Sequence, residues 1–319
     1  MQKRIITRAI ATAVLAAASA LSAQATEFYG NIDMGVGYQK LNGKTTTRVD
    51  SGNSSASIYG IRDTEDLGGG LKAIIQLEGS FKGDDGTQGA ANTPFNRDTF
   101  AGLTNGVHTI KLGRLKTLNR SALLEYDPFG SSAWGIGANT IDQNGTFAAN
   151  SVQYDYRRNS ITASFQHTAG EQAGGGVSAG SIDSGQARYT TGPMSVTVTR
   201  TRVDDKAAVT ASTTNTMVGA SYDFGVVKTT VMYQNSNASK TAPIDNRVIV
   251  SAVAPLSSTV NVMAQAGQVK LANGDKSNLV AIGGRYVLSK RTGLYASLTK
   301  SDLPSQDSKQ LVAGIRHLF

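Results

Sequence analysis

The sequence predicts an all-β fold, a sixteen-stranded antiparallel β-barrel that crosses a membrane. Short segments alternate apolar residues with polar or glycine residues, which indicates strands. Tight turns alternate with longer polar loops along the chain, a pattern typical of outer-membrane barrels. One connection, residues 116–149, lacks strand alternation for about thirty residues, far more than most connections in compact domains. We hypothesise that this long third outside loop folds into the lumen and narrows the bore.

The first 25 residues have the features of a cleaved export signal. Three basic residues among the first eight are followed by an apolar stretch and by Ala23-Gln24-Ala25, which matches a cleavage site. We therefore expect a signal peptide at 1–25 and one barrel domain at 26–319. Removal of the signal lowers the formal net charge from +8 to +5. The remaining charge is spread along the chain and gives little support to nucleic-acid binding.

The composition argues against several kinds of site. The chain has no cysteine, so it has neither a disulfide framework nor a thiol nucleophile. His108, His167 and His317 lie far apart and lack metal-ligand spacing, so we expect no metal and no cofactor. No apolar run of about twenty residues follows the signal, which excludes helical membrane spans.

The first segment after the signal, residues 27–39, shows the strand pattern. Phe28, Ile32 and Val36 lie on one side, and Asn31 and Asp33 on the other. In a soluble sandwich the apolar side would face a core, whereas in a membrane barrel it would face lipid and the polar side would line the lumen. One strand cannot separate these alternatives, but the full strand count can.

The remaining chain supplies the other strands as hairpins. We expect tight turns near 67, 106, 158, 192, 225, 256 and 290, and longer loops near 44, 87, 130, 175, 208, 240, 273 and 304. The tally is sixteen strands of about seven to twelve residues with all long loops at one end, which favours the barrel over a soluble all-β domain. The last strand carries alternating residues up to Phe319, so we expect it to pair with the first strand and close the barrel. Phe319, Tyr286 and Phe28 would then belong to an interfacial aromatic girdle.

Several motifs occur in order through the mature chain. They are FYGNIDMGVGY, RDTEDLGGGLKAIIQLE, NRDTFAGL, KLGR, DPFG, GASYDFGV, LSKRTGLYAS and AGIRHLF. Together they resemble the classical trimeric porins of Gram-negative outer membranes, especially the neisserial and β-proteobacterial branch. The resemblance implies a homotrimer in outer-membrane lipid that passes small hydrophilic solutes and ions through a water-filled channel. It also implies recognition of Phe319 by the barrel assembly machinery.

The resemblance implies an eyelet where wall cations face loop carboxylates. Arg97, five residues before Gly102, matches the wall arginine; its parity with Thr99 and Ala101, opposite Phe100, also predicts a lumen position. Asp127 matches an acidic constriction residue, and Glu125 is a second candidate. Arg97 could instead be a lumen residue satisfied by a neighbouring strand, and Asp127 could simply begin an Asp-Pro turn.

The match to the eyelet pattern is incomplete. Ile58, Asn31 and Ala148 stand where relatives often have basic residues. Other cations could compensate, namely Arg62, Lys72 and Lys111 by parity, and Lys116 and Arg120 on the loop. These gaps predict a weakly selective pore. Arg114 shares parity with Ile110 and Leu112, so it should lie outside the lumen. The resemblance implies that an arginine here latches neighbouring subunits, and the alternative is a solvated rim arginine.

Three classes of function remain open. A general diffusion porin needs only bore size and weak charge selectivity. A specific channel would need a ladder of aromatic residues along the lumen, which the sequence does not show. A barrel enzyme would need a Ser-His-acid set, and neither G-x-S-x-G nor a His near a plausible nucleophile is present. We therefore predict a general diffusion porin that is not an enzyme.

Overall fold

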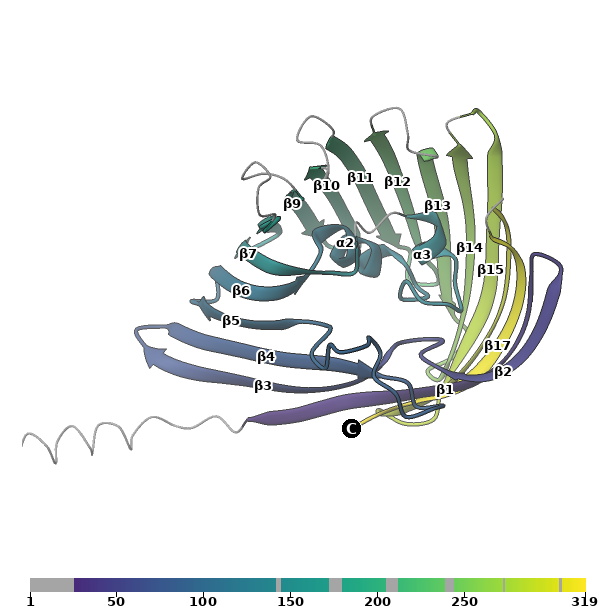
Figure 1. Cartoon of the computed structure of the whole chain (residues 1–319), viewed down its shortest axis with the longest axis horizontal. Coiled ribbons are helices and arrows are strands. Elements are labelled where there is room, and N and C mark those ends of the chain that lie inside the picture. The colour runs from purple at the N-terminus through teal and green to yellow at the C-terminus, as the bar shows by residue number, and fades with distance from the viewer. Residues whose placement is uncertain are drawn as a thin grey trace, which may run out of the picture.

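The structure is a computed structural model that describes residues 26–141, 145–171, 180–204, 212–238, 244–271, 273–303 and 306–319. Its strands form one closed antiparallel sheet, and two short helices lie inside the ring of strands (Figure 1). The strands are β1 (Glu27–Leu41), β2 (Lys44–Ser51), β3 (Ser57–Gly68), β4 (Leu71–Phe81), β5 (Thr99–Thr104), β6 (His108–Lys116), β7 (Phe147–Arg158), β8 (Ile161–Thr168), β9 (Ile182–Thr191), β10 (Met194–Asp204), β11 (Ser212–Asp223), β12 (Lys228–Ala238), β13 (Ile244–Pro255), β14 (Val260–Leu271), β15 (Lys276–Val287), β16 (Thr292–Leu303) and β17 (Gln306–Leu318). The helices are α2 (Leu118–Tyr126) and α3 (Gly137–Thr140).

The predicted sixteen-stranded barrel is confirmed, with one strand divided in two. β2 pairs with the far half of β1, from Leu41↔Lys44 to Met34↔Ser51. β3 then pairs with the near half of β1, from Asn31↔Ile58 to Glu27↔Arg62. β2 and β3 are therefore two parts of one barrel strand, interrupted at residues 52–56.

The first connection differs from the prediction. A long loop was expected near residue 44, but β1 and β2 are joined by Asn42-Gly43 alone. Both residues have positive φ, 48° and 82°, as a two-residue hairpin turn requires. The predicted tight turns are present at the other end of the barrel. The loops expected near 175, 208, 240 and 304 lie outside the described residues.

The two faces of the sheet have opposite chemistry. Phe28 (63% exposed), Ile282 and Phe165 point outward, as the period of two predicts. Polar side chains such as Asn31, Gln265 and Thr199 are buried on the inner side. This inversion relative to a soluble protein suits a barrel whose outer wall meets lipid and whose lumen is polar.

The C-terminal strand closes the barrel. β17 pairs with β1 from Asn31↔Leu318 to Leu41↔Ser308. Gly30 and Phe319 exchange backbone hydrogen bonds of 3.1 and 3.0 Å. The Phe319 ring lies 5.9 Å from the Phe28 ring, centroid to centroid. Closure leaves neither β1 nor β17 as a free sheet edge.

Candidate functional site

The long third loop, residues 117–146, begins with a well-defined helix. Thr117 is the N-cap of α2, and its side chain accepts a 3.2 Å hydrogen bond from the backbone N–H of Arg120. Leu118, Ala122 and Tyr126 recur every four residues and are fully buried, so one helix face packs against a surface. The sequence pattern missed this helix because only nine residues carry it.

That surface is the inner wall of the barrel. Side chains of inward-facing residues bind the backbone of α2: Gln186 Nε2 donates to the Leu118 carbonyl (3.1 Å), and Thr230 Oγ1 donates to the Tyr126 carbonyl (2.7 Å). The Tyr126 hydroxyl lies 3.1 Å from Ser195 Oγ. The wall strands thus supply polar side chains that form hydrogen bonds with backbone carbonyls and with the Tyr126 hydroxyl of the loop.

Apolar packing adds to these hydrogen bonds. The loop and the inner wall share one buried cluster, to which the loop gives Ala122, Leu123, Tyr126, Phe129, Trp134, Ile136 and Ile141, and the wall gives Met217, Met232, Ile249, Met263, Val269, Leu279, Ala281, Tyr295, Leu303 and Val312. Wall glycines allow close approach, since a Cβ on Gly219 would lie 2.8 Å from the Tyr126 ring. The loop is therefore fixed to inner-wall residues from β9 to β17. Figure 1 shows α2 and α3 on that side of the barrel.

Asp127 is buried in this contact and does not face open solvent. Its carboxylate accepts hydrogen bonds from the backbone N–H groups of Phe129 (2.8 Å) and Ser131 (2.7 Å) and from Gln265 Nε2 (2.6 Å). Burial raises the pKa of the Asp127 carboxyl, and these three donors oppose the shift. The geometry is that of an Asp-Pro turn held against the wall.

Arg120 faces Asp127 across the loop. Its guanidinium donates a 2.9 Å hydrogen bond to the Ser131 carbonyl and a second one to Ser131 Oγ. Burial, with a smaller contribution from nearby Arg97, lowers the pKa of Arg120 to about 10, and Asp127 opposes the shift. Arg120 and Arg97 therefore lie close enough to repel each other.

Arg97 forms an ion pair with Glu78 on β4. The Nε–Oε1 distance is 2.5 Å, and the Arg97 and Glu78 side chains are 21% and 8% exposed. The Tyr29 hydroxyl donates a second hydrogen bond to the Glu78 carboxylate, of 2.9 Å.

The parity argument for Arg97 is wrong. Ala101 is exposed and pairs with Leu112, whose side chain points outward, whereas Phe100 lines an inner cavity. β5 begins only at Thr99, so alternation cannot be extended to Arg97.

Three other predicted residues form ion pairs on the inner side. Lys111 Nζ lies 2.9 Å from Asp155 Oδ2, and Lys116 Nζ lies 3.3 Å from Asp98 Oδ2. Arg188 Nη1, on β9, lies 3.1 Å from Glu125 Oε2. Lys111, Asp155 and Arg188 line one cavity of ≈ 430 Å³ beside α2.

Arg62 and Arg114 lie apart from this group. Arg62 pairs with Glu27 through two 2.8 Å contacts at the tight-turn end of the barrel, and both side chains are about half exposed. Arg114 follows the irregular Gly113 and donates a 2.9 Å hydrogen bond to the Asn96 carbonyl of its own chain. That contact fixes the segment that carries Arg97.

Sequence reasoning missed the partners of the predicted cations. Glu78, Asp98, Asp155 and Arg188 each neutralise a candidate residue. Glu78 and Asp155 could have been found from strand parity, because both stand at inward positions among polar neighbours. Arg285 and Arg316, on the inner side of β15 and β17, were also missed.

Within the described residues, no helix is long and apolar enough to span a membrane, and no group of three or more His, Cys, Asp or Glu could hold a metal ion. A closed barrel with an apolar exterior, a polar charged interior and a loop packed inside it defines a class of protein, the outer-membrane channel.

Comparison with known proteins gives the family. The model of the Gram-negative porin family matches residues 11–304, so the chain belongs to that family. Outer membrane porin protein 32 of Delftia acidovorans is 34% identical over 91% of this chain and 87% of its own length. An outer membrane porin of Bordetella pertussis is 28% identical over the full length of both chains. An anion-selective porin from Comamonas acidovorans matches with a TM-score of 0.82 and 27% identity, covering 92% of this chain and 99% of that one.

Membership confirms the main predictions. The protein is a passive diffusion channel of the Gram-negative outer membrane. Members of this family are channels and not enzymes.

Proposed function

We propose that residues 117–146 form the constriction of the channel and that the pore has a weak preference for anions. The loop's fixation to β9–β17 carries the first part, because a segment packed on the inner wall takes up bore cross-section. The balance of the accessible charges inside the barrel supports the second part, the weak preference for anions.

Most predicted eyelet cations are neutralised locally. Arg97, Lys111 and Lys116 each lie within ion-pair distance of a carboxylate, and such pairs present little net charge to a passing ion. This explains why selectivity should be weak.

The remaining accessible charge is positive. Arg157, Arg285 and Arg316 line inner cavities and form no ion pair within the described part of the chain. The inner carboxylates Asp33 and Asp127 are buried and occupied by hydrogen-bond donors. An anion preference is in line with the anion-selective porin that this chain resembles.

A sugar-specific channel is the weaker alternative. Its aromatic surfaces would have to be accessible along the lumen, yet Tyr126, Phe129 and Trp134 are fully buried between the loop and the wall. The loop's aromatic residues therefore hold it in place.

Ion selectivity tests the proposal directly. Purified protein in planar bilayers should give a reversal potential of anionic sign in a potassium chloride gradient, with a permeability ratio of a few fold and no block by added sugars. A cationic sign would refute the anion preference. Saturable block by one sugar would establish the specific channel.

We further propose that the protein is a homotrimer, exported with cleavage before Thr26, and that Phe319 is read by the barrel assembly machinery. The family supports the trimer, and the exposed position of Phe319 at the end of β17 suits recognition before closure. Light scattering in detergent should give three copies per particle. The N-terminal sequence of the purified protein should begin near Thr26.

A further inference from the structure

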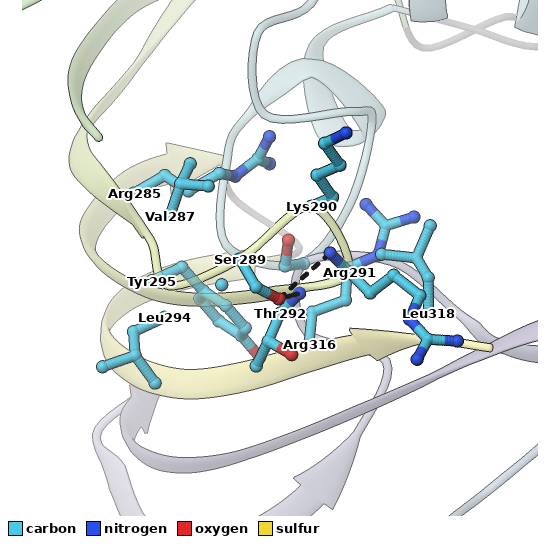
Figure 2. Close-up of a pocket in the computed structure, with 12 residues that line it drawn as sticks. Arg285, Val287, Ser289, Lys290, Arg291, Thr292, Leu294, Tyr295, Arg316 and Leu318 are labelled. Atoms are coloured by element: carbon cyan, nitrogen blue, oxygen red, sulfur yellow. Dashed lines mark hydrogen bonds between the residues drawn. The ribbon is translucent and has the colours of Figure 1, made fainter. Parts of the chain in front are cut away.

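A small pocket lies at the tight-turn end of the barrel, beside the turn from β15 to β16. Its volume is ≈ 170 Å³, and it is lined by Ser54, Arg285, Lys290, Arg291 and Arg316 among others. Figure 2 shows these four basic side chains around the Ser289–Thr292 turn. The pocket is separate from the ion pairs around α2.

The positive charges of this pocket form no direct ion pair in the described part of the chain. Within the described residues, none of its four cations lies within 4.0 Å of a carboxylate oxygen. Asp33 is the acidic group that interacts with Arg285 and Arg316 at longer range. Its oxygens are occupied by the Tyr295 hydroxyl (2.6 Å) and by three backbone N–H groups of residues 53–55.

Two buried polar atoms of the pocket residues are unsatisfied. Arg316 Nε and Ser54 Oγ are both inaccessible and have no hydrogen-bond partner among the residues that the structure describes. A buried donor without a partner costs about 1–3 kcal/mol, so native proteins rarely leave one unexplained. Neither atom is open to solvent, so an oxyanion would bind the remaining guanidinium nitrogens of Arg316 first and would reach these two atoms only after the side chains shift.

Strand register creates this concentration of charge. Arg285 pairs with Tyr295 on β16, and Arg316 pairs with Gly293 two residues away on the same strand. Both arginines share the inward parity of the buried residues Ala281 and Val312. Gly293 leaves space between them, so the two guanidinium groups border one cavity. The two like charges repel each other across this cavity.

We propose that this pocket binds a phosphate group. A tetrahedral dianion offers several acceptor oxygens at once, and guanidinium groups bind such oxygens in pairs. The pocket is large enough for one phosphate group with its first waters. Inorganic phosphate and phosphomonoesters both carry this group. The site would bind either of them near the tight-turn end of the channel.

Trp134 provides a reporter for binding. The Arg285 guanidinium carbon lies 5.4 Å from the centre of the Trp134 ring, and the chain has no other tryptophan. An anion that draws Arg285 toward the pocket changes the electrostatic environment of the indole. Intrinsic fluorescence of the folded protein in detergent therefore measures occupancy without any conductance measurement.

The experiment is a titration with inorganic phosphate at constant ionic strength, compared with chloride. Wild type should show a saturable change with phosphate and none with chloride. Arg316→Gln should weaken binding roughly tenfold by removing one charge-assisted donor. Arg157→Gln, an inner cation outside the pocket, is the matched control and should bind as wild type does. Glycerol phosphate distinguishes the two sources, since a phosphomonoester that fits should compete.

Three results would overturn the proposal: no saturable signal, equal responses to chloride and phosphate, or unchanged binding in Arg316→Gln. Resistance of the folded barrel to unfolding in detergent shows that each variant is native. Arg285 and Arg316 take part in both proposals, but binding is measured here without ion flow, so a failure of this site and a failure of the proposed selectivity are seen in different experiments.

Discussion

Removal of Arg97 tests both the stability and the electrostatics of the eyelet. Arg97→Ala leaves Glu78, whose side chain is 8% exposed, without its ion-pair partner. The Tyr29 hydroxyl (2.9 Å) and Gln76 Nε2 (3.5 Å) remain as its donors. Breaking a fully buried pair costs about 3–5 kcal/mol, and the partial exposure of Arg97 reduces our expectation to about 2 kcal/mol. The double variant Arg97→Ala/Glu78→Gln should be more stable than the single one, because no buried charge is left unpaired.

Ion selectivity should respond to the same substitutions at Arg97 and Glu78. A unit charge about 6 Å from a passing ion interacts with it by roughly 0.7 kcal/mol in water and roughly 0.4 kcal/mol after screening. Anions and cations respond with opposite signs, so Arg97→Ala should shift the permeability ratio about fourfold toward cations. Glu78→Gln should shift it toward anions by a similar factor, and the double variant should return close to wild type.

Reversal potentials in planar bilayers and thermal unfolding in detergent measure the two effects. The matched control is Arg62→Ala, which removes the same charge from the exposed pair with Glu27 at the tight-turn end. It should change stability by less than about 1 kcal/mol. If Arg97→Ala and the double variant have the same selectivity, the pair lies away from the ion path and Arg97 has no role in the eyelet.

Three further predictions concern the loop and the barrel seam. Because burial raises the pKa of Asp127, the folded state binds its proton more tightly than the unfolded state does; wild type should therefore gain stability relative to Asp127→Asn as the pH falls from that raised value toward about 4, and a constant difference would contradict the burial. Gly219→Val should displace the Tyr126 ring, so single-channel conductance and its noise should rise; unchanged traces would show that the wall can adapt. Phe319→Ala should lower the amount of folded protein in the outer membrane while protein refolded in detergent still conducts, and normal membrane levels would remove Phe319 as an assembly signal.

The barrel could be predicted from the sequence because lipid imposes a strict period of two on every strand. Alternation of Phe28 and Ile32 with Asn31 and Asp33 requires no knowledge of distant partners. The Asn42-Gly43 sequence is also typical of a two-residue turn, but we expected a long loop near residue 44 and therefore did not predict this turn.

The site was less predictable because it depends on pairs that come from separate strands. Parity failed for Arg97 because Phe100, and not Ala101, faces inward on β5, and because β5 begins only at Thr99. Arg188 reaches Glu125 across 63 residues of chain, and Glu78 reaches Arg97 from the preceding strand. Such partners follow from register and loop path, which a local pattern does not encode.

The loop and the barrel are stabilised by different interactions, and this separation has a consequence for unfolding. The outer wall is apolar and the strands are held by a closed ladder of backbone bonds, whereas the water-excluded core lies between the loop and the inner wall. Release of the loop exposes that core but breaks no strand pairing. We therefore expect two transitions on heating in detergent, in which Trp134 becomes exposed before the β-sheet signal in circular dichroism is lost. Gly219→Val should lower the first transition and leave the second in place. A single coincident transition in both variants would show that the loop is part of the cooperative barrel unit and would refute this separation.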